Sequence, residues 1–368
     1  MDYYANDLSG TDETDDSTDE TSLMLLGEDG EFLEDGTVGG IAGIRYQGDF
    51  DNEVVFGTDW IDKLFGGGGN DTIYGFEGDD NLGGGWGRDV IFGGPGDDTI
   101  RTSNVFGLTH MENDGDFASG GSGNDTIRGA DTGDFAEILH GGPGHDFINA
   151  YDGNDKLYGD DGDDELIVRL GDNEIHGGNG DDIITVNAQG VGQDGNNDLH
   201  GGAGDDDITA GQGNDDLYGG DGNDILFGNN GDDELWGGAG DDILKGGQRT
   251  VGLMQDVLRG GSGNDTLFAG RDNNPNLDGG GTVYLYGDDG DDLMYGTNTA
   301  NEYQWGGEGD DRIHGGNRNL IVSINGNGGD DIIYPGSGIT GSEGIRAGKG
   351  DDVINPTEVI FAMDGSVD

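Results

Sequence analysis

The sequence contains no cysteine and little positive charge, and both absences exclude whole classes of protein. Without cysteine, neither disulfide bonds nor thiolate metal sites can form. With only 15 lysines and arginines, the chain has no basic surface with which to bind nucleic acid or an anionic membrane. No apolar run is long enough for a membrane span. Residues 1–20 lack the basic and apolar regions of a signal peptide, so any export must use a route without one.

What the sequence has instead is acid and glycine. Aspartate and glutamate total 78 residues, which gives a formal net charge of −63, and glycine contributes 83 residues. Such a chain repels itself, and a hydrophobic content of only 31% leaves it little to collapse around. The acidic residues are regularly spaced rather than scattered. This spacing favours a fold completed by cations over a merely solvated acidic surface.

A nine-residue repeat accounts for both excesses. Residues 219–227, 228–236 and 237–245 are consecutive copies of G-G-x-G-x-D-x-U-x, where U is a large apolar residue. We count 19 units with glycine at position four, aspartate at six and an apolar residue at eight; they begin at residues 66, 75, 84, 93, 120, 141, 150, 159, 177, 201, 210, 219, 228, 237, 260, 287, 306, 326 and 347. A repeat of this length indicates a stacked architecture.

The chemistry of the unit predicts its structure. Glycines at positions one, two and four permit positive φ angles, so the first six residues can form a tight turn. The last three residues form a short strand whose position-eight side chain, as in Ile73, Leu82, Ile91 and Ile100, points inward. A core this thin cannot offset the ordering entropy, and the aspartates add repulsion. Calcium, which takes six to eight oxygen ligands, would supply the missing stabilisation from carboxylates and turn carbonyls.

On these residues the sequence resembles the RTX, or hemolysin-type, calcium-binding repeat family over about residues 48–355. The resemblance implies an all-β fold, a right-handed parallel β-roll (a β-solenoid) with two units per coil. It also implies that each Ca²⁺ lies between the turns of units n and n+2, as with Asp206 and Asp224 or Asp215 and Asp233. The position-six aspartates are therefore the predicted metal ligands: Asp62, Asp71, Asp80, Asp89, Asp98, Asp125, Asp146, Asp155, Asp164, Asp182, Asp206, Asp215, Asp224, Asp233, Asp242, Asp265, Asp292, Asp311, Asp331 and Asp352.

Two units per coil place alternate turns on opposite edges. Counting from Gly57, with each irregular segment taken as an enlarged unit, one edge carries Asp71 and Asp89, a break at Gly107, and then an unbroken series from 125 to 265. The other edge begins with Asp62, Asp80 and Asp98 and later carries Asn173 and Asn197 at position six. The enlarged turns 129–140, 186–200 and 246–259 also fall on it. Beyond about residue 285 this count predicts that the aspartate-complete edge changes sides. We expect 10 to 16 calcium ions, mostly on that edge. The enlarged turns are either tolerated insertions or a contact surface.

Position nine is often aromatic, and these side chains should point outward: Phe65, Tyr74, Phe92, Tyr158, Tyr218, Phe227, Trp236, Phe268, Tyr295 and Tyr334. They could form a platform for sugars or another protein. The alternative, which we favour, is a stabilising ladder of rings along the sheet.

Neither an H-E-x-x-H zinc site nor a G-x-S-x-G nucleophile elbow is present, so we expect no enzyme. Residues 1–47 should be acidic and largely disordered, with an apolar cluster at 23–26 that could cap the first coil. The repeats should occupy 48–355. Residues 356–368 have the mixed apolar and acidic character of the C-terminal signal of type I secretion, although a simple cap fits equally well.

These observations predict a secreted or cell-surface protein of a Gram-negative bacterium that folds when it binds calcium. We favour a structural role in a matrix, surface layer or biofilm, with self-association in calcium. The first alternative is a calcium-dependent adhesin or polysaccharide-binding module. The second is the repeat part of an RTX toxin or enzyme, which the starting Met1 and the presence of both flanks disfavour.

Overall fold

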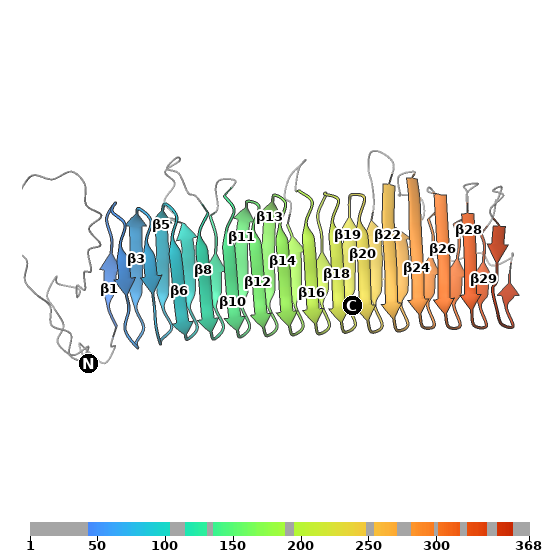
Figure 1. Cartoon of the computed structure of the whole chain (residues 1–368), viewed down its shortest axis with the longest axis horizontal. Coiled ribbons are helices and arrows are strands. Elements are labelled where there is room, and N and C mark those ends of the chain that lie inside the picture. The colour runs from blue at the N-terminus through green and yellow to red at the C-terminus, as the bar shows by residue number, and fades with distance from the viewer. Residues whose placement is uncertain are drawn as a thin grey trace, which may run out of the picture.

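The computed structural model describes residues 43–103, 115–130, 135–187, 195–247, 254–270, 281–297, 301–316, 322–336 and 344–355. These residues form a long β-solenoid of short strands (Figure 1). Every regular element within these ranges is a strand, so the described chain contains no helix that could cross a membrane. The apolar cluster at 23–26 and the C-terminal tail lie outside the described residues.

The strands form two parallel sheets. The 16-stranded sheet contains, in spatial order, β1 (Arg45–Gln47), β3 (Lys63–Gly68), β5 (Asn81–Trp86), β7 (Thr99–Ser103), β9 (Thr126–Arg128), β11 (Phe147–Asp152), β13 (Glu165–Leu170), β15 (Ile183–Val186), β17 (Asp207–Thr209), β19 (Ile225–Asn229), β21 (Ile243–Gly247), β23 (Thr266–Gly270), β25 (Leu293–Tyr295), β27 (Arg312–His314), β29 (Ile332–Tyr334) and β31 (Val353–Ile354).

The 15-stranded sheet contains β2 (Val54–Phe56), β4 (Thr72–Tyr74), β6 (Val90–Pro95), β8 (Phe117–Ser122), β10 (Ile138–Pro143), β12 (Lys156–Asp161), β14 (Glu174–Asn179), β16 (Asp198–Ala203), β18 (Asp216–Asp221), β20 (Glu234–Ala239), β22 (Met254–Ser262), β24 (Gly281–Asp289), β26 (Asn301–Glu308), β28 (Val322–Gly328) and β30 (Gly344–Arg346). Successive strands therefore alternate between the sheets.

Each strand pairs with the strand two places further along the chain. Leu217 of β18 lies beside Leu235 of β20, for example, one coil of 18 residues later. This register confirms the predicted parallel β-roll with two nonapeptide units per coil. It also means that equivalent positions of every second unit stack into straight columns.

The core is a pair of such columns facing each other between the sheets. It consists almost entirely of position-eight residues, and Ile73, Leu82, Ile91 and Ile100 are each 0% exposed. The neighbouring positions seven and nine point outward, as the period of a strand requires. The sequence prediction of a narrow, single-file apolar core is confirmed.

The glycines at positions one and two are needed for two separate reasons. Gly220, at position two, has a φ of +126°, which side chains other than glycine rarely adopt. At Gly219, position one, an added Cβ atom would lie 2.2 Å from Oδ2 of Asp224 and 2.6 Å from the carbonyl oxygen of Gly237. The turn therefore closes around the aspartate of its own unit.

The solenoid has two unlike edges. On the edge where the chain passes from the 15-stranded to the 16-stranded sheet, every connection is short; we call it the regular edge. The opposite connections form the variable edge, and every gap between the described ranges after residue 43 falls there. Figure 1 shows the regular edge as the row of uniform turns at the bottom.

The predicted change of edges near residue 285 is wrong. The backbone N–H of Asp98 donates to Asp125, and that of Asp265 donates to Asp292, so all four lie on the regular edge. Each pair is separated by 27 residues, one coil of 18 plus nine. Two insertions on the variable edge are thus as long as one repeat, and the count mistook each for a unit.

Candidate calcium ladders

The position-six residues, which we call rungs, form a continuous hydrogen-bonded ladder along the regular edge. Oδ1 of each aspartate accepts the backbone N–H of the rung one coil earlier, over 2.6 to 3.1 Å. The rungs are Asp62, Asp80, Asp98, Asp125, Asp146, Asp164, Asp182, Asp206, Asp224, Asp242, Asp265, Asp292, Asp311, Asp331 and Asp352. The predicted pair Asp206 and Asp224 is adjacent in this ladder, at 2.8 Å.

The second carboxylate oxygen of almost every rung is buried without a hydrogen-bond donor. Oδ2 of Asp224 is one example, and from Asp80 to Asp331 each aspartate of the regular edge shares this state. Asp62 differs because its carboxylate accepts bonds from Thr58 and from the N–H of Ile44, which close the first coil. A buried carboxylate oxygen with no donor is costly, so a whole column of them requires a counter-charge.

Burial also shifts the acidity of these groups. Burial raises the pKa of Asp224 to about 6 and, together with repulsion from Asp125 and Asp80, that of Asp98 to about 8, although the N–H of the preceding rung opposes both shifts. On the variable edge, burial and the neighbours Asp256 and Asp215 raise the pKa of Asp233 to about 10. Without a cation, burial therefore disfavours the charged form of these carboxylates.

The arrangement suits a hard cation that takes oxygen ligands. Within the described ranges, no three histidine, aspartate or glutamate side chains converge as a metal cluster. An ion between two rungs must therefore take turn carbonyl oxygens besides the carboxylates, the mixed oxygen set that Ca²⁺ accepts. The residues present fit calcium: consecutive rungs would supply carboxylates, and bound ions would supply the positive charge that the orphaned Oδ2 atoms require.

The variable edge carries a second, less uniform ladder. Five predicted ligands lie there, Asp71, Asp89, Asp155, Asp215 and Asp233, with Asp215 and Asp233 adjacent as expected. The rungs run in order Glu53, Asp71, Asp89, Asp116, Glu137, Asp155, Asn173, Asn197, Asp215, Asp233 and Asp256. The next positions in register are Val283, Glu302 and Val322, so the aspartate rungs of this edge end at Asp256.

Two aspartate rungs were missing from the predicted ligands. Asp116 and Asp256 are both buried and leave Oδ2 without a donor, as the predicted rungs do. Both follow irregular turns that lack the glycine at position four, so the full motif did not match. The second half of the repeat, D-x-U-x-G-G, is intact at 256–261 and, with alanine at position eight, at 116–121. That shorter pattern would have found them.

Glutamate rungs hold their own turns instead. Oε1 of Glu137 accepts the hydroxyl of Thr102 and, over 3.1 Å, the N–H of Ala130. Near the C-terminal end, Oε2 of Glu302 accepts the N–H of Gly316 over 2.9 Å. The glutamate side chain is one methylene longer than that of aspartate, so its carboxylate reaches hydrogen-bond donors in the adjoining turn.

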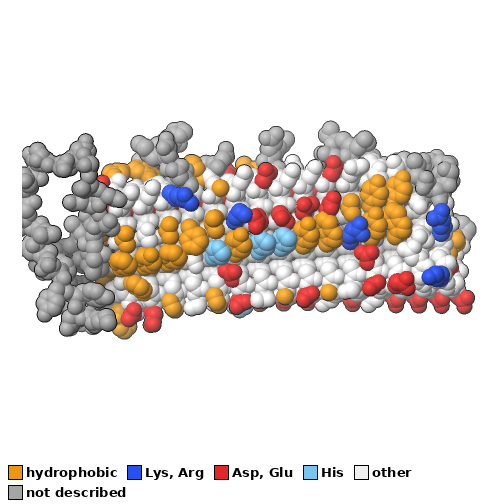
Figure 2. Space-filling model, viewed as in Figure 1, with side chains coloured by type: hydrophobic (Ala, Val, Ile, Leu, Met, Phe, Trp, Pro, Cys, Tyr) orange, Lys and Arg blue, Asp and Glu red, His pale blue; other side chains and the backbone are white. Residues whose placement is uncertain are grey.

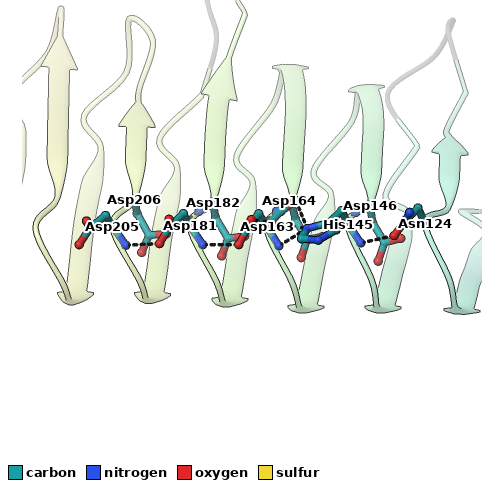
Figure 3. Close-up of polar contacts among 9 residues, drawn as sticks. All are labelled: Asn124, His145, Asp146, Asp163, Asp164, Asp181, Asp182, Asp205 and Asp206. Carbon is teal, nitrogen blue, oxygen red and sulfur yellow. Dashed lines mark hydrogen bonds and ion pairs between the residues drawn. The ribbon is translucent and has the colours of Figure 1, made fainter.

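Position five forms a further ladder on the outside of the turn. Its hydrogen bonds run in the opposite direction along the chain from those of the rungs. Each side chain accepts the N–H of the following coil, as Asp181 does from Asp205 over 2.8 Å. His145 takes part through Nδ1, which accepts the N–H of Asp163 over 2.9 Å. Figure 3 shows these two ladders side by side from Asn124 to Asp206. Together they join consecutive turns through side chains in both directions.

Comparison with known families agrees with this geometry. The model of the RTX calcium-binding nonapeptide repeat matches residues 56–91, 83–104, 112–134, 131–166, 158–189, 191–226, 218–248, 255–274, 277–302, 305–319 and 321–341, well over half of the chain. The chain belongs to the RTX calcium-binding repeat family. All the rungs described above except Glu53 and Asp352 lie in the matched residues, and calcium is the ion that the family implies. No curated protein matches the sequence.

The outward aromatic residues of this RTX protein form a ladder along the 15-stranded sheet. From His140 through Tyr158, His176, His200 and Tyr218 to Trp236, ring centroids lie 4.4 to 5.2 Å apart with interplanar angles of 2° to 12°. Figure 2 shows this band of apolar and histidine side chains running along the face of the sheet. The rings of this series stack face to face, as the stabilising-ladder interpretation predicts for the 15-stranded sheet.

Proposed function

We propose that this chain is a secreted, non-enzymatic calcium-binding protein that folds when calcium fills its ladders. The observation that carries the proposal is the column of buried aspartates whose Oδ2 atoms lack donors, repeated at nearly every coil. Without ions, their mutual repulsion and desolvation oppose the coil. Each ion that binds the folded state alone stabilises it, so binding and folding are coupled.

Calcium concentration gives the coupling a direction. Extracellular calcium modules bind with Kd values of about 10⁻⁴ to 10⁻³ M, so such sites stay empty in cytosol and fill outside the cell. A chain with a net charge of −63 would remain expanded before export. This supports secretion from a Gram-negative bacterium by a type I route that transports unfolded chains.

The share of the chain that the repeats occupy supports a structural role. Repeats fill the described residues from end to end and build an elongated solenoid (Figure 1). We therefore propose a component of an extracellular matrix, surface layer or biofilm that associates with further copies in calcium. Size-exclusion chromatography with mass measurement, with and without calcium, tests the self-association.

Circular dichroism tests the central claim. The chain should show high β content in millimolar calcium and lose most of it on exhaustive chelation, with recovery when calcium but not magnesium is restored. Magnesium is the matched control because it prefers a rigid octahedral site and retains water ligands. Equal β content in the chelated and calcium-loaded protein would exclude coupled folding.

A further inference from the structure

Two rungs of the variable edge, Asn173 and Asn197, carry no charge and, like Glu137, have no buried side-chain atom without a hydrogen-bond partner. We propose that Asn173 and Asn197 are calcium-free rungs, in which the side-chain amide makes the link between coils that an ion makes elsewhere. The inference rests on the proposed calcium ladders and assigns two intervals within them, 173–197 and 197–215, that bind no ion.

The contacts of Asn173 show how the amide does this. Its Oδ1 accepts the N–H of Asp155 over 3.0 Å, the same bond that an aspartate rung makes. Its Nδ2 donates to the carbonyl oxygen of Gly171 in its own turn, over 3.1 Å. The same Nδ2 donates to Oδ1 of Asn197, the next rung, over 2.8 Å. One NH₂ group thus joins a turn carbonyl to the rung of the following coil.

Asn197 repeats this arrangement one coil later. Its Nδ2 donates to the carbonyl oxygen of Gly195 over 3.2 Å and to Oδ1 of Asp215 over 2.8 Å. Both asparagines are only 3% exposed, so these bonds form away from water. The repetition indicates a property of the rung position rather than of one irregular turn.

The contrast with aspartate identifies what the amide replaces. In Asp155 and Asp215, the rungs on either side of the asparagines, Oδ2 is buried and has no donor. In an asparagine rung that position is occupied by Nδ2, which has two acceptors. The partners of Nδ2 are a turn carbonyl and the next rung's oxygen, the oxygen types that calcium takes. An NH₂ group satisfies both without bringing in a charge.

The chemistry also explains why an ion should be excluded there. Replacing carboxylate by amide removes the negative charge that favours a divalent cation and directs N–H bonds at the oxygens it would need. The interval from 155 to 173 remains a candidate for calcium, because Oδ2 of Asp155 still lacks a donor. The pair therefore forms a section of the variable edge whose links do not depend on calcium concentration.

Substitution by aspartate tests the assignment directly. Asn173→Asp and Asn197→Asp should each raise the number of calcium ions bound per chain by one, and the double variant should raise it by two, measured by equilibrium dialysis and elemental analysis. Asn214→Asp is the matched control: it adds the same charge on the same edge, but at an exposed position five whose Oδ1 accepts the N–H of Asp232. Its ion count should equal that of the native chain.

The reverse substitution provides a second, independent measurement. In Asp224→Asn, the new amide should donate to the neighbouring rung Asp242 and to the carbonyl of Gly222, so the variant should fold and bind one ion fewer. This arm decides the matter even if the aspartate variants fail to fold in calcium, as judged by circular dichroism.

The outcomes separate this inference from the proposed function. If the native chain binds no calcium, the ladder function itself fails. If the native chain binds calcium but the Asn173→Asp, Asn197→Asp and Asp224→Asn variants all keep its ion count, the ladders stand and the amide assignment is overturned. An ion count that rises equally in the Asn214→Asp control would also overturn it, because added charge alone would then account for the gain.

Discussion

The two edges of this solenoid are built from the same repeat but differ in how far they tolerate change. On the regular edge every turn is short, and aspartate rungs succeed one another from Asp62 to Asp352. On the variable edge the rungs include glutamate, asparagine and valine, and all the longer connections lie there. The insertions thus lie on the edge whose aspartate ladder is interrupted.

The physical reason lies in how each rung depends on its neighbours. An aspartate rung shares its hydrogen bond with the preceding coil and, with calcium, its ion with the following one. Any insertion in the turn displaces the carbonyls that the ion needs. Glu137 and Asn197, which follow insertions, draw their donors or acceptors from nearby turns rather than from an ion alone. The variable edge can therefore carry insertions that the regular edge cannot.

The edges should differ most in how much stability is lost when one aspartate rung is replaced by alanine. Asp224→Ala removes a ligand from two ion intervals of the regular edge and should cost about 3–5 kcal/mol in free energy of unfolding in limiting calcium. Asp215→Ala borders one ion interval, since the Asn197 amide fills the other, and should cost about half as much. Calcium titrations followed by circular dichroism measure both. Equal losses would mean that the edges are equivalent.

Position-one glycines offer a second comparison. At Gly219 a Cβ atom would meet Oδ2 of Asp224 at 2.2 Å, whereas at Gly315, beyond the last aspartate rung of the variable edge, the nearest atom is Pro335 O at 3.0 Å. Gly219→Ala should therefore lower stability by about 3 kcal/mol and weaken calcium binding, because overpacking displaces the carboxylate. Gly315→Ala should cost about 1 kcal/mol and leave binding unchanged. Thermal unfolding in saturating calcium compares the two, and similar losses would contradict the comparison.

Much of this comparison could be predicted from the sequence, and the part that failed has a definite cause. The turn, the inward position eight and the rung at position six follow from one unit alone, so Asp206 and Asp224 were paired correctly. Register through irregular segments did not follow, because an insertion of nine residues is indistinguishable from a unit when units are counted. Asp98 and Asp125 were therefore assigned to opposite edges. The hydrogen bond between them and the pairing of β7 with β9 show that they share one.

The edges should also differ in how protons compete with calcium. The pKa of both Asp224 and Asp233 is raised from 3.8, to about 6 and about 10 respectively. Because each pKa is higher in the fold than in the unfolded chain, protonation of the carboxyl stabilises the calcium-free fold fully below about pH 4. This contribution to the free energy of unfolding is lost as the pH rises through the raised pKa. In a chain that ions at other rungs already hold folded, Asp233 would thus release a proton at pH 8 when its own ion binds, whereas Asp224 is already ionised.

Calorimetry in buffers of different ionisation enthalpy measures this release. In partly loaded, folded protein, the remaining ions should bind more weakly at pH 6 than at pH 8, by about tenfold per pH unit for each proton displaced. At pH 8, Asp233→Asn should reduce the protons released per chain, whereas Asp224→Asn should leave the number almost unchanged. The opposite ranking would show that the variable edge is no less hydrated than the regular one.

The smallest effect concerns the core where the variable edge has lost its acidic ladder. Gln304 is 0% exposed in the position-eight column, between Leu285 and Ile324, and its Oε1 has no hydrogen-bond partner. Gln304→Leu should raise the free energy of unfolding by about 1 kcal/mol, because it removes a buried unsatisfied oxygen and restores the apolar column.

The matched change in the calcium-rich coils is Leu217→Gln, in the same column of the same sheet. It should lower the free energy of unfolding by about 3 kcal/mol, because it places an unpaired amide in an apolar column. Thermal unfolding compares the two variants. If Gln304→Leu destabilises instead, the amide is needed by its neighbour Glu302, since Nε2 of Gln304 and Oε2 of Glu302 both approach Gly296. The last coils would then be held by a buried polar pair where the rest of the edge uses calcium.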